Sequence, residues 1–286
     1  MARVILVGCG KVGMSFAYQL VTSENRADEL VLIDICKDRA CGDAQDLSHA
    51  AAYAKKKVKI WVGDYADCDK ADIIVIAAGL AQKNCKQTRT ELNKQNANIM
   101  KSIVSNVAKT KFNGVYLVVT NPVDAMSHVV QKASGFPHNR VIGSGTTLDS
   151  ARLWHLLGSG HEGTFVLGEH GDSSFIPWSN FNLSLSKSEK ENILHGVRSS
   201  AYDIIKKKGS TYYGIGVCML DIVNAILNDS KRVLLVSGYS KEHDVYMGWP
   251  NVLGRGGIEK TLPVKLTEEE NVMLQKTVAV IRKTMI

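Results

Sequence analysis

Short apolar runs alternate with stretches of helical periodicity through the first half of the chain. The runs that predict strands cover residues 3–7, 30–33, 58–62, 73–77, 115–119 and 140–143. Helical patterns lie between and after them, at residues 12–22, 38–52, 90–110, 123–134 and 147–157. Strands that alternate with helices form parallel sheets with helices on both faces. This half therefore predicts an α/β fold with a doubly wound parallel sheet.

The second half of the chain has a different pattern. Predicted strands at residues 164–168, 232–239 and 257–264 are mixed with predicted helices at 187–208, 214–229 and 267–284, which is typical of an α+β domain. No linker rich in Pro, Gly or Ser separates the halves. We therefore expect two closely packed domains, residues 1–144 and residues 145–286.

A glycine-rich motif follows the first predicted strand directly. Residues 8–13 read Gly-Cys-Gly-Lys-Val-Gly and lead into the first predicted helix. Glycines at these positions permit a tight turn, a close approach of the backbone to a pyrophosphate, and close packing of the helix on the strand. The second predicted strand ends in Asp34, at the spacing expected for an acid that binds a ribose 2′-hydroxyl. This acid favours NAD over NADP, while Lys37 and Arg39 nearby leave NADP open. The predicted cofactor contacts here are Gly8, Gly10, Val12, Gly13 and Asp34.

A histidine between two glycines marks the candidate catalytic site. His170 stands in the segment Gly-Glu-His-Gly-Asp, residues 168–172, and an imidazole gives or takes a proton near neutral pH. Upstream, Asp149 is a carboxylate suited to orienting the ring, and Arg152 follows one helical turn later. A guanidinium holds a carboxylate substrate by two parallel hydrogen bonds. The three residues predict acid–base chemistry on an anionic substrate, with a purely structural ion pair as the alternative.

Composition narrows the classes of protein that fit. The chain has 286 residues, of which 45% are hydrophobic, and a formal net charge of +7. The basic residues are scattered, and the lysine runs at 55–57 and 206–208 lack interleaved aromatic residues, so we expect no nucleic-acid partner. Six cysteines form no CxxC pair and no cluster with His, which indicates free thiols in a reducing compartment and no bound metal. No segment predicts a signal peptide or a membrane span, so we expect a soluble, cytoplasmic protein without a membrane partner.

The ordered motifs resemble those of the L-lactate/malate dehydrogenases along nearly the whole chain, and most closely those of the bacterial NAD-dependent L-lactate dehydrogenases. Besides the segments above, the resemblance includes Gly-Asp-Tyr at 63–65, Ala-Ala-Gly at 77–79, Thr-Arg at 88–89, Thr-Asn-Pro-Val-Asp at 120–124 and Thr-Tyr-Tyr-Gly at 211–214. It implies a dinucleotide-binding domain of the Rossmann type followed by a catalytic α+β domain. It also implies hydride transfer between NAD and a small 2-keto or 2-hydroxy acid, in a homo-oligomer that is a tetramer in most relatives.

The resemblance assigns roles to individual residues. His170 would exchange a proton with the carbonyl oxygen, Asp149 would orient its ring, and Arg152 would bind the substrate carboxylate. Arg89 follows a polar segment that resembles a lid, which would bring this arginine onto the carbonyl when it closes. The remaining implied contacts are Asn121 near the carbonyl, Thr211 beside the substrate side chain, and Tyr65, Gly79 and again Asn121 along the cofactor.

Gln82 predicts which acid is preferred. Malate-type relatives carry Arg at this position, where it pairs with a second carboxylate. A neutral Gln82 would leave that carboxylate unpaired, at a cost of roughly several kcal/mol for a buried charge, so pyruvate and lactate are favoured. Three departures from the family pattern accompany it. The stretch between Lys83 and Thr88 is longer by one residue, and the segments 154–165 and 178–201 are shorter than in relatives.

Other functions stay open at this stage. A broader L-2-hydroxyacid dehydrogenase, of the hydroxyisocaproate type, fits the same motifs. An NAD-dependent glycosidase would share the dinucleotide domain but would need a metal site built from Cys and His, and a catalytically silent NAD-binding protein would not need the paired His170 and Asp149.

The sequence also bears on regulation. Many bacterial relatives bind fructose 1,6-bisphosphate through an Arg and a His whose positions are held here by Trp154 and Gly163. Neither side chain offers a cation to a phosphate. We therefore expect this effector not to activate the protein, although His155 and His161 lie close by in the sequence.

Overall fold

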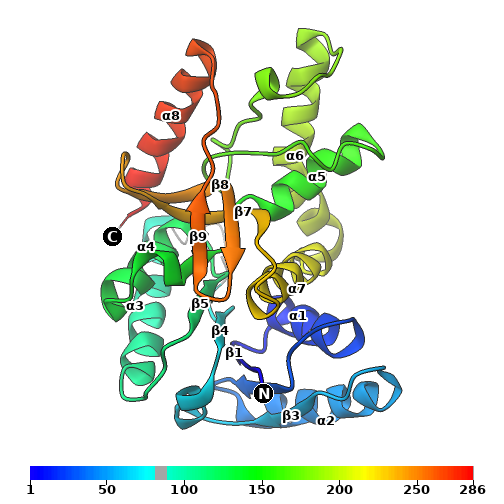
Figure 1. The fold of residues 1–286 in the computed structure, drawn as a ribbon, viewed down its shortest axis with the longest axis vertical. Coiled ribbons are helices and arrows are strands. Elements are labelled where there is room, and N and C mark those ends of the chain that lie inside the picture. Colours follow the sequence, from blue (N-terminus) through cyan, green and yellow to red (C-terminus); the bar gives the residue numbers. More distant parts are fainter. Residues whose placement is uncertain (81–88, 286) are drawn as a thin grey trace.

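The computed structural model describes residues 1–80 and 89–285, and only the backbone of residues 89 and 90. The first half follows the predicted alternation of strands and helices (Figure 1). Its elements are β1 (Arg3–Val7), α1 (Lys11–Thr22), β2 (Glu29–Ile33), α2 (Lys37–Tyr53), β3 (Lys59–Val62), η1 (Tyr65–Lys70), β4 (Ile73–Ile76), α3 (Arg89–Val107), β5 (Val115–Val118), α4 (Val123–Ser134), η2 (His138–Arg140), β6 (Val141–Gly143) and α5 (Thr147–Leu157).

The second half adds three more strands and three long helices. Figure 1 places α6 and α8 at the end of the molecule opposite α2 and β3. The elements are η3 (Trp178–Asn180), α6 (Lys187–Lys208), α7 (Tyr213–Leu227), β7 (Arg232–Ser240), β8 (Val245–Gly254), β9 (Gly257–Thr261) and α8 (Glu268–Thr284).

All the strands within residues 1–80 and 89–285 belong to a single nine-stranded sheet in the order β3-β2-β1-β4-β5-β6-β7-β8-β9. The first six are parallel, in the strand order typical of a doubly wound dinucleotide-binding sheet. From β6 onward the pairing is antiparallel, and Gly143 of β6 faces Ser237 of β7. The predicted α/β class, with a parallel first half and an α+β second half, is confirmed.

Two apolar layers cover the parallel strands. Alternate residues of β1, such as Leu6, face a layer built by α1, α2 and α7, while Ile5 and Val7 face a layer built by α3 and α4. Because α7 comes from the second half and packs against α1, the two halves share one core (Figure 1). Each strand of the sheet's centre is thus buried on both faces, which explains its unbroken run of β-branched and aliphatic residues.

Two strand predictions were wrong. Strand β8 was missed because Gly248 and Pro250 interrupt its sequence, yet Pro250 lies opposite Leu235 within the ladder. The expected strand at 164–168 is an irregular segment, in which only Leu167 and Gly168 form isolated bridges, with Phe175 and Gly248. Elsewhere the predicted bounds are within a few residues of those observed. No helix in the described part of the chain is long and apolar enough to cross a membrane.

Candidate active site

The glycine-rich turn lies between β1 and α1, at the carboxyl end of the parallel strands. Gly8 has φ of +103°, and a Cβ built on it would lie 2.4 Å from the backbone nitrogen of Ala78. A Cβ on Gly13 would lie 2.1 Å from the carbonyl oxygen of Gly8. Gly10, in contrast, has no neighbour within 4 Å of such a Cβ, which leaves open space above the first turn of α1. The turn therefore fits a pyrophosphate, whose oxygens require exposed backbone N–H groups.

The carboxylate of Asp34 holds this turn in place. Its two oxygens accept the backbone N–H groups of Cys9, at 2.7 Å, and Cys36, at 2.8 Å. Arg39 adds a longer ion pair at 3.1 Å. Asp34 thus joins the ends of β1 and β2, a positioning role that the spacing argument did not anticipate.

The ends of β4 and β5 meet at an asparagine that the sequence analysis missed. Asn96, on α3, is 2% exposed, and its Oδ1 accepts the backbone N–H of Leu80 at 2.8 Å. Its Nδ2 donates to the carbonyl oxygen of Asn121 at 2.9 Å. Gly79 lies against Thr120, so tightly that a Cβ would come within 2.5 Å of a methyl group. In the sequence Asn96 is one polar residue among several on a predicted helix, and nothing there identifies its partners.

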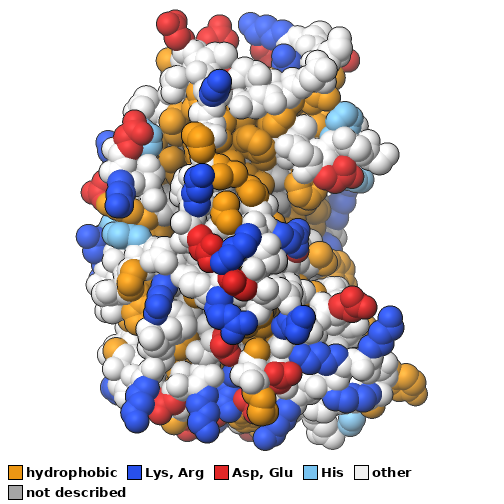
Figure 2. All heavy atoms as spheres, viewed as in Figure 1, with side chains coloured by type: hydrophobic (Ala, Val, Ile, Leu, Met, Phe, Trp, Pro, Cys, Tyr) orange, Lys and Arg blue, Asp and Glu red, His pale blue; other side chains and the backbone are white. Residues whose placement is uncertain are grey.

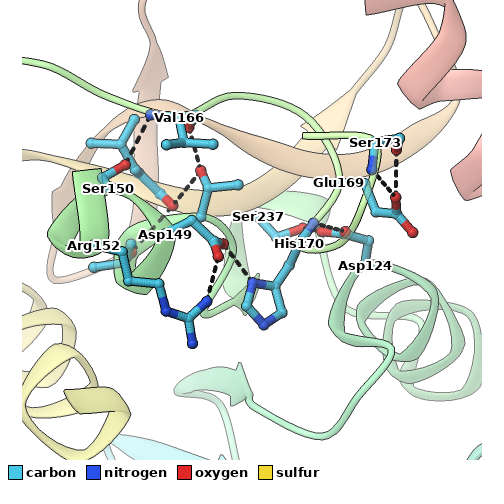
Figure 3. A network of polar contacts seen from close by, with 12 residues as sticks. Asp124, Asp149, Ser150, Arg152, Val166, Glu169, His170, Ser173 and Ser237 are labelled. Carbon is cyan, nitrogen blue, oxygen red and sulfur yellow. Dashed lines mark hydrogen bonds and ion pairs between the residues drawn. The ribbon is translucent and has the colours of Figure 1, made fainter. Parts of the chain in front are cut away.

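His170, Asp149 and Arg152 lie together, as Figure 3 shows. The Nδ1 atom of His170 lies 2.6 Å from one oxygen of Asp149, and Nη1 of Arg152 donates to the other oxygen at 2.8 Å. The Asp149 side chain is 7% exposed, whereas those of Arg152 and His170 are 12% and 20% exposed. Because Nδ1 is engaged with the carboxylate, Nε2 is the ring nitrogen left to meet a substrate.

Hydrogen bonds from the start of α5 fix the segment that leads to His170. The hydroxyl of Thr146 donates to the carbonyl oxygen of Val166 at 2.6 Å, and the hydroxyl of Ser150 accepts the N–H of Val166 at 3.0 Å (Figure 3). Gly168 exchanges two backbone hydrogen bonds with Gly248 of β8, the strand that was missed. The histidine therefore lies on an irregular segment that a helix and a strand hold rigid.

Burial and the neighbouring charges have opposite effects on the pKa values of His170 and Asp149. Burial alone lowers the pKa of His170, but the charge and hydrogen bond of Asp149 outweigh it, so that the pKa is raised. Burial raises the pKa of Asp149, and the neighbouring His170 and Arg152 reverse this effect, so that the pKa is lowered. The arrangement favours an imidazolium beside a carboxylate, which is the form that delivers a proton.

A second buried carboxylate contacts the same histidine from the other side. Asp124, in the first turn of α4, is 4% exposed and accepts the backbone N–H of His170 at 2.9 Å. Its other oxygen accepts the hydroxyl of Ser237 at 2.5 Å. Burial, partly offset by these two bonds, raises the pKa of Asp124 to about 6. In the sequence, Asp124 is only the last residue of the Thr-Asn-Pro-Val-Asp segment at 120–124, and nothing there indicates this role.

For the remaining predicted residues that it describes, the structure gives the element in which each lies but no contact within the site. Tyr65 begins η1 and packs, partly buried, on the core of the sheet, and Val12 packs on the opposite layer. Thr211 lies in the connection between α6 and α7. Arg89 is the first residue of α3, but its side chain and all of Gln82 lie outside the described residues. Within residues 1–80 and 89–285, no three His, Cys, Asp or Glu side chains are gathered as a metal ion would require.

A glycine turn at the end of a doubly wound sheet, together with a paired histidine and aspartate, is typical of NAD-dependent oxidoreductases. Residues 2–143 match the NAD binding domain of lactate/malate dehydrogenase, and residues 146–286 match its alpha/beta C-terminal domain. The chain therefore belongs to the lactate/malate dehydrogenase family.

Individual relatives are similar over almost the full length. L-lactate dehydrogenase 1 of Bacillus cereus (strain ATCC 14579) is 43% identical, with 99% of this chain and 97% of that protein aligned. L-lactate dehydrogenase 2 of Bacillus anthracis is 41% identical over the same shares. Two crystal structures match 99% of this chain and 97% of their own. One is a lactate dehydrogenase from a Medee basin deep-sea metagenome library, with a TM-score of 0.94 and 41% identity. The other is a minor L-lactate dehydrogenase from Enterococcus mundtii, with a TM-score of 0.95 and 34% identity.

Proposed function

We propose that this chain interconverts pyruvate and L-lactate, with NAD as the hydride carrier. The observation that carries the proposal is the 2.6 Å contact between His170 Nδ1 and Asp149, with Arg152 on the second carboxylate oxygen. Bacterial relatives named L-lactate dehydrogenase, 43% identical over 99% of this chain, support the choice of acid.

The roles of the side chains follow from this geometry. When NADH is bound, it supplies a hydride to the C2 carbon of pyruvate. The imidazolium of His170 gives its Nε2 proton to the carbonyl oxygen, which becomes the hydroxyl of lactate, and the neutral ring is reprotonated from solvent. Asp149 keeps Nδ1 protonated and the ring in place. Arg152 uses one N–H group for Asp149, and a guanidinium has five, so donors remain for the substrate carboxylate.

The roles of the other predicted residues belong to the same proposal. Arg89 stabilises the developing negative charge on the carbonyl oxygen, and Gln82 leaves a second substrate carboxylate without a partner. Asn121 and Thr211 contact the substrate. We further propose that residues 1–144 bind the cofactor and that residues 145–286 contribute the proton donor and the carboxylate clamp. The cofactor contacts are Gly8, Gly10, Val12, Gly13, Asp34, Tyr65, Gly79 and Asn121.

We also propose that the protein is a cytoplasmic homo-oligomer. Several large apolar side chains on the helices are exposed, including Tyr18 of α1 at 53%, Val217 of α7 at 51% and Ile205 of α6 at 45%. Figure 2 shows further apolar side chains gathered on the upper half of one face. A groove is also lined by Trp249, Leu262 and Leu274. Contacts between copies of the chain would cover such surfaces. The cysteines Cys9, Cys36, Cys41, Cys68 and Cys218 are free thiols, which suits a reducing compartment.

A spectrophotometric assay tests the activity. NADH oxidation is followed with pyruvate, oxaloacetate and 2-ketoisocaproate side by side, and each is repeated with NADPH. We expect kcat/KM to be highest for pyruvate with NADH. A preference for 2-ketoisocaproate would assign the chain to the hydroxyisocaproate type, which is the second candidate, and no turnover with any 2-keto acid would overturn the proposal.

A further inference from the structure

Asp124 contacts the catalytic segment in a way that Asp149 does not. Asp149 holds the imidazole ring, whereas Asp124 accepts the backbone N–H of His170. Figure 3 shows the two carboxylates on opposite sides of the histidine. Rotation of the ring is therefore limited by one residue, and displacement of its backbone by the other.

Three segments that are distant in the sequence meet at Asp124. The residue lies in the first turn of α4, just after the Asn121–Pro122 peptide at the end of β5. Its partners are His170 and Ser237, and Ser237 lies opposite Gly143 in the sheet. Because β5 and α4 belong to the cofactor-binding half, Asp124 links the substrate asparagine proposed above to the proton donor.

The other charged groups that act on Asp124 and His170 come from α5 and from the segment of His170 itself. Asp149 and Arg152 approach His170 from α5, and Glu169 lies beside it in the same segment. Glu169 is engaged with Ser173, so its bonds do not reach His170. The Asp124 charge acts on His170 and raises the pKa of that imidazole in addition to Asp149.

We propose that Asp124 is a positioning residue for proton transfer: it fixes the backbone of His170 and favours the protonated ring through its negative charge. This inference rests on the proposed function. A purely structural role would predict lost stability without any change in the titration of His170.

Two substitutions separate the charge from the hydrogen bond. Asp124→Asn removes the charge, while its amide oxygen still accepts the His170 N–H and its amide nitrogen can donate to the Ser237 hydroxyl. Asp124→Ala removes both bonds. Ser237→Ala is the matched control, because it deletes the hydroxyl that donates to Asp124 but leaves the carboxylate on His170.

The titration of His170 is followed by NMR of protein labelled with ¹³C at histidine Cε1, and its signal is assigned by its loss in His170→Gln. We expect the apparent pKa of the ring to fall by about half a unit or more in Asp124→Asn, with a parallel shift in the pH profile of kcat/KM for pyruvate. In Asp124→Ala we expect an additional fall of about tenfold or more in kcat, because the ring is displaced. Ser237→Ala should change the ring pKa far less.

An unchanged ring pKa in a folded Asp124→Asn protein would overturn the proposal. If neither Asp124 variant folds, the wild-type protein decides the question. The His170 amide must then exchange slowly with solvent and must shift as Asp124 ionises, and a freely exchanging amide would reject the inference. The NMR titration needs no turnover, so a protein that fails to reduce pyruvate would disprove the proposed function and leave this test intact.

Discussion

At the scale of single residues, the chemistry depends on burying an imidazole beside a carboxylate without leaving either uncompensated. Asp149 is 5% exposed as a residue, and a carboxylate buried to this degree needs partners on both oxygens. His170 and Arg152 supply them at 2.6 and 2.8 Å. The ion pair is therefore a structural requirement of the fold as well as the proposed proton-transfer unit.

His170→Asn should abolish turnover and leave NADH binding intact. Asparagine still accepts or donates a hydrogen bond but has no titratable proton, and loss of a positioned general acid costs roughly 10²–10⁴-fold. Steady-state kinetics and a fluorescence titration with NADH measure the two effects. His155→Asn, an exposed histidine on α5, is the control and should keep full activity. Near-normal turnover in His170→Asn would remove the histidine from the mechanism.

The raised pKa of His170 predicts opposite pH profiles for the two directions of reaction. Pyruvate reduction needs the protonated ring, which a raised pKa maintains to higher pH. Its kcat/KM should stay level below that pKa and fall about tenfold per pH unit above it. Lactate oxidation needs the neutral ring and should rise over the same range. Parallel profiles in the two directions would contradict the assignment.

At the scale of elements, the turn between β1 and α1 contains glycines in two different environments. Gly8 adopts φ of +103° and lies against the backbone of Ala78, so its requirement is steric. Gly10 lies beside open space, so no neighbouring atom excludes a side chain there, and under the proposed function its glycine leaves room for the cofactor pyrophosphate. The same motif thus contains one glycine that the fold requires and one that the surrounding atoms do not require.

Gly8→Ala and Gly10→Ala should therefore fail in different ways. In Gly8→Ala the new methyl group meets backbone at 2.4 Å, and we expect a loss of about 2–4 kcal/mol in the free energy of unfolding. Gly10→Ala should keep a Tm close to the wild type but bind NADH more weakly. Thermal denaturation and NADH titration separate the two. Equal losses of stability in both variants would show that the fold requires glycine at both positions.

The segment before α3 is expected to select the substrate. Gln82→Arg should move the preference from pyruvate toward oxaloacetate, because a guanidinium can pair with the second carboxylate. The ratio of kcat/KM for the two acids measures the change. Lys83→Arg is the control, since it keeps the charge at the neighbouring position. A ratio unchanged in Gln82→Arg would indicate that the additional residue between Lys83 and Thr88 places another side chain against the substrate.

At the scale of the whole molecule, the sheet runs without a break from the cofactor-binding half into the second half. The junction is short, because β6 pairs with β7 only at Gly143 and Ser237. Two other contacts strengthen it: α7 packs on α1, and Asp124 binds Ser237. Since the site is built from both halves, a change at this junction is expected to reach the chemistry as well as stability.

Fructose 1,6-bisphosphate should not activate the protein. Trp154 donates its indole N–H to the carbonyl oxygen of Thr164 at 2.7 Å and thus closes the short connection after α5, and Gly163 in that connection has no side chain. Initial rates at subsaturating pyruvate, with and without millimolar effector, measure the effect. A clear fall in apparent KM that is lost in His161→Ala would show that a histidine of this connection replaces the missing cations.

The order of the elements in the first half and the glycine turn were determined locally, and for that reason the sequence alone predicted them. Alternating or uninterrupted apolar residues indicate strands, and the spacing of glycines indicates a tight turn. Both patterns involve only residues that are close in the chain. The pairing of His170 with Asp149 was predicted from family resemblance together with residue chemistry. Strand β8 was not predicted, because Gly248 and Pro250 are typical turn residues. Only their pairing with β7 shows that they belong to a strand.

Only the tertiary structure decided which residues, distant in the sequence, form hydrogen bonds with the buried polar side chains of the site. Asp34 was expected from its spacing to bind a ribose, and the structure adds that its oxygens accept the backbone N–H groups of Cys9 and Cys36. Asn96 and Asp124 received no role because nothing local distinguishes them from other polar helix residues. Their function follows from burial, since a buried polar group must find partners wherever the fold brings them. Those partners, Leu80 for Asn96 and Ser237 for Asp124, lie on segments that meet only when the sheet is complete.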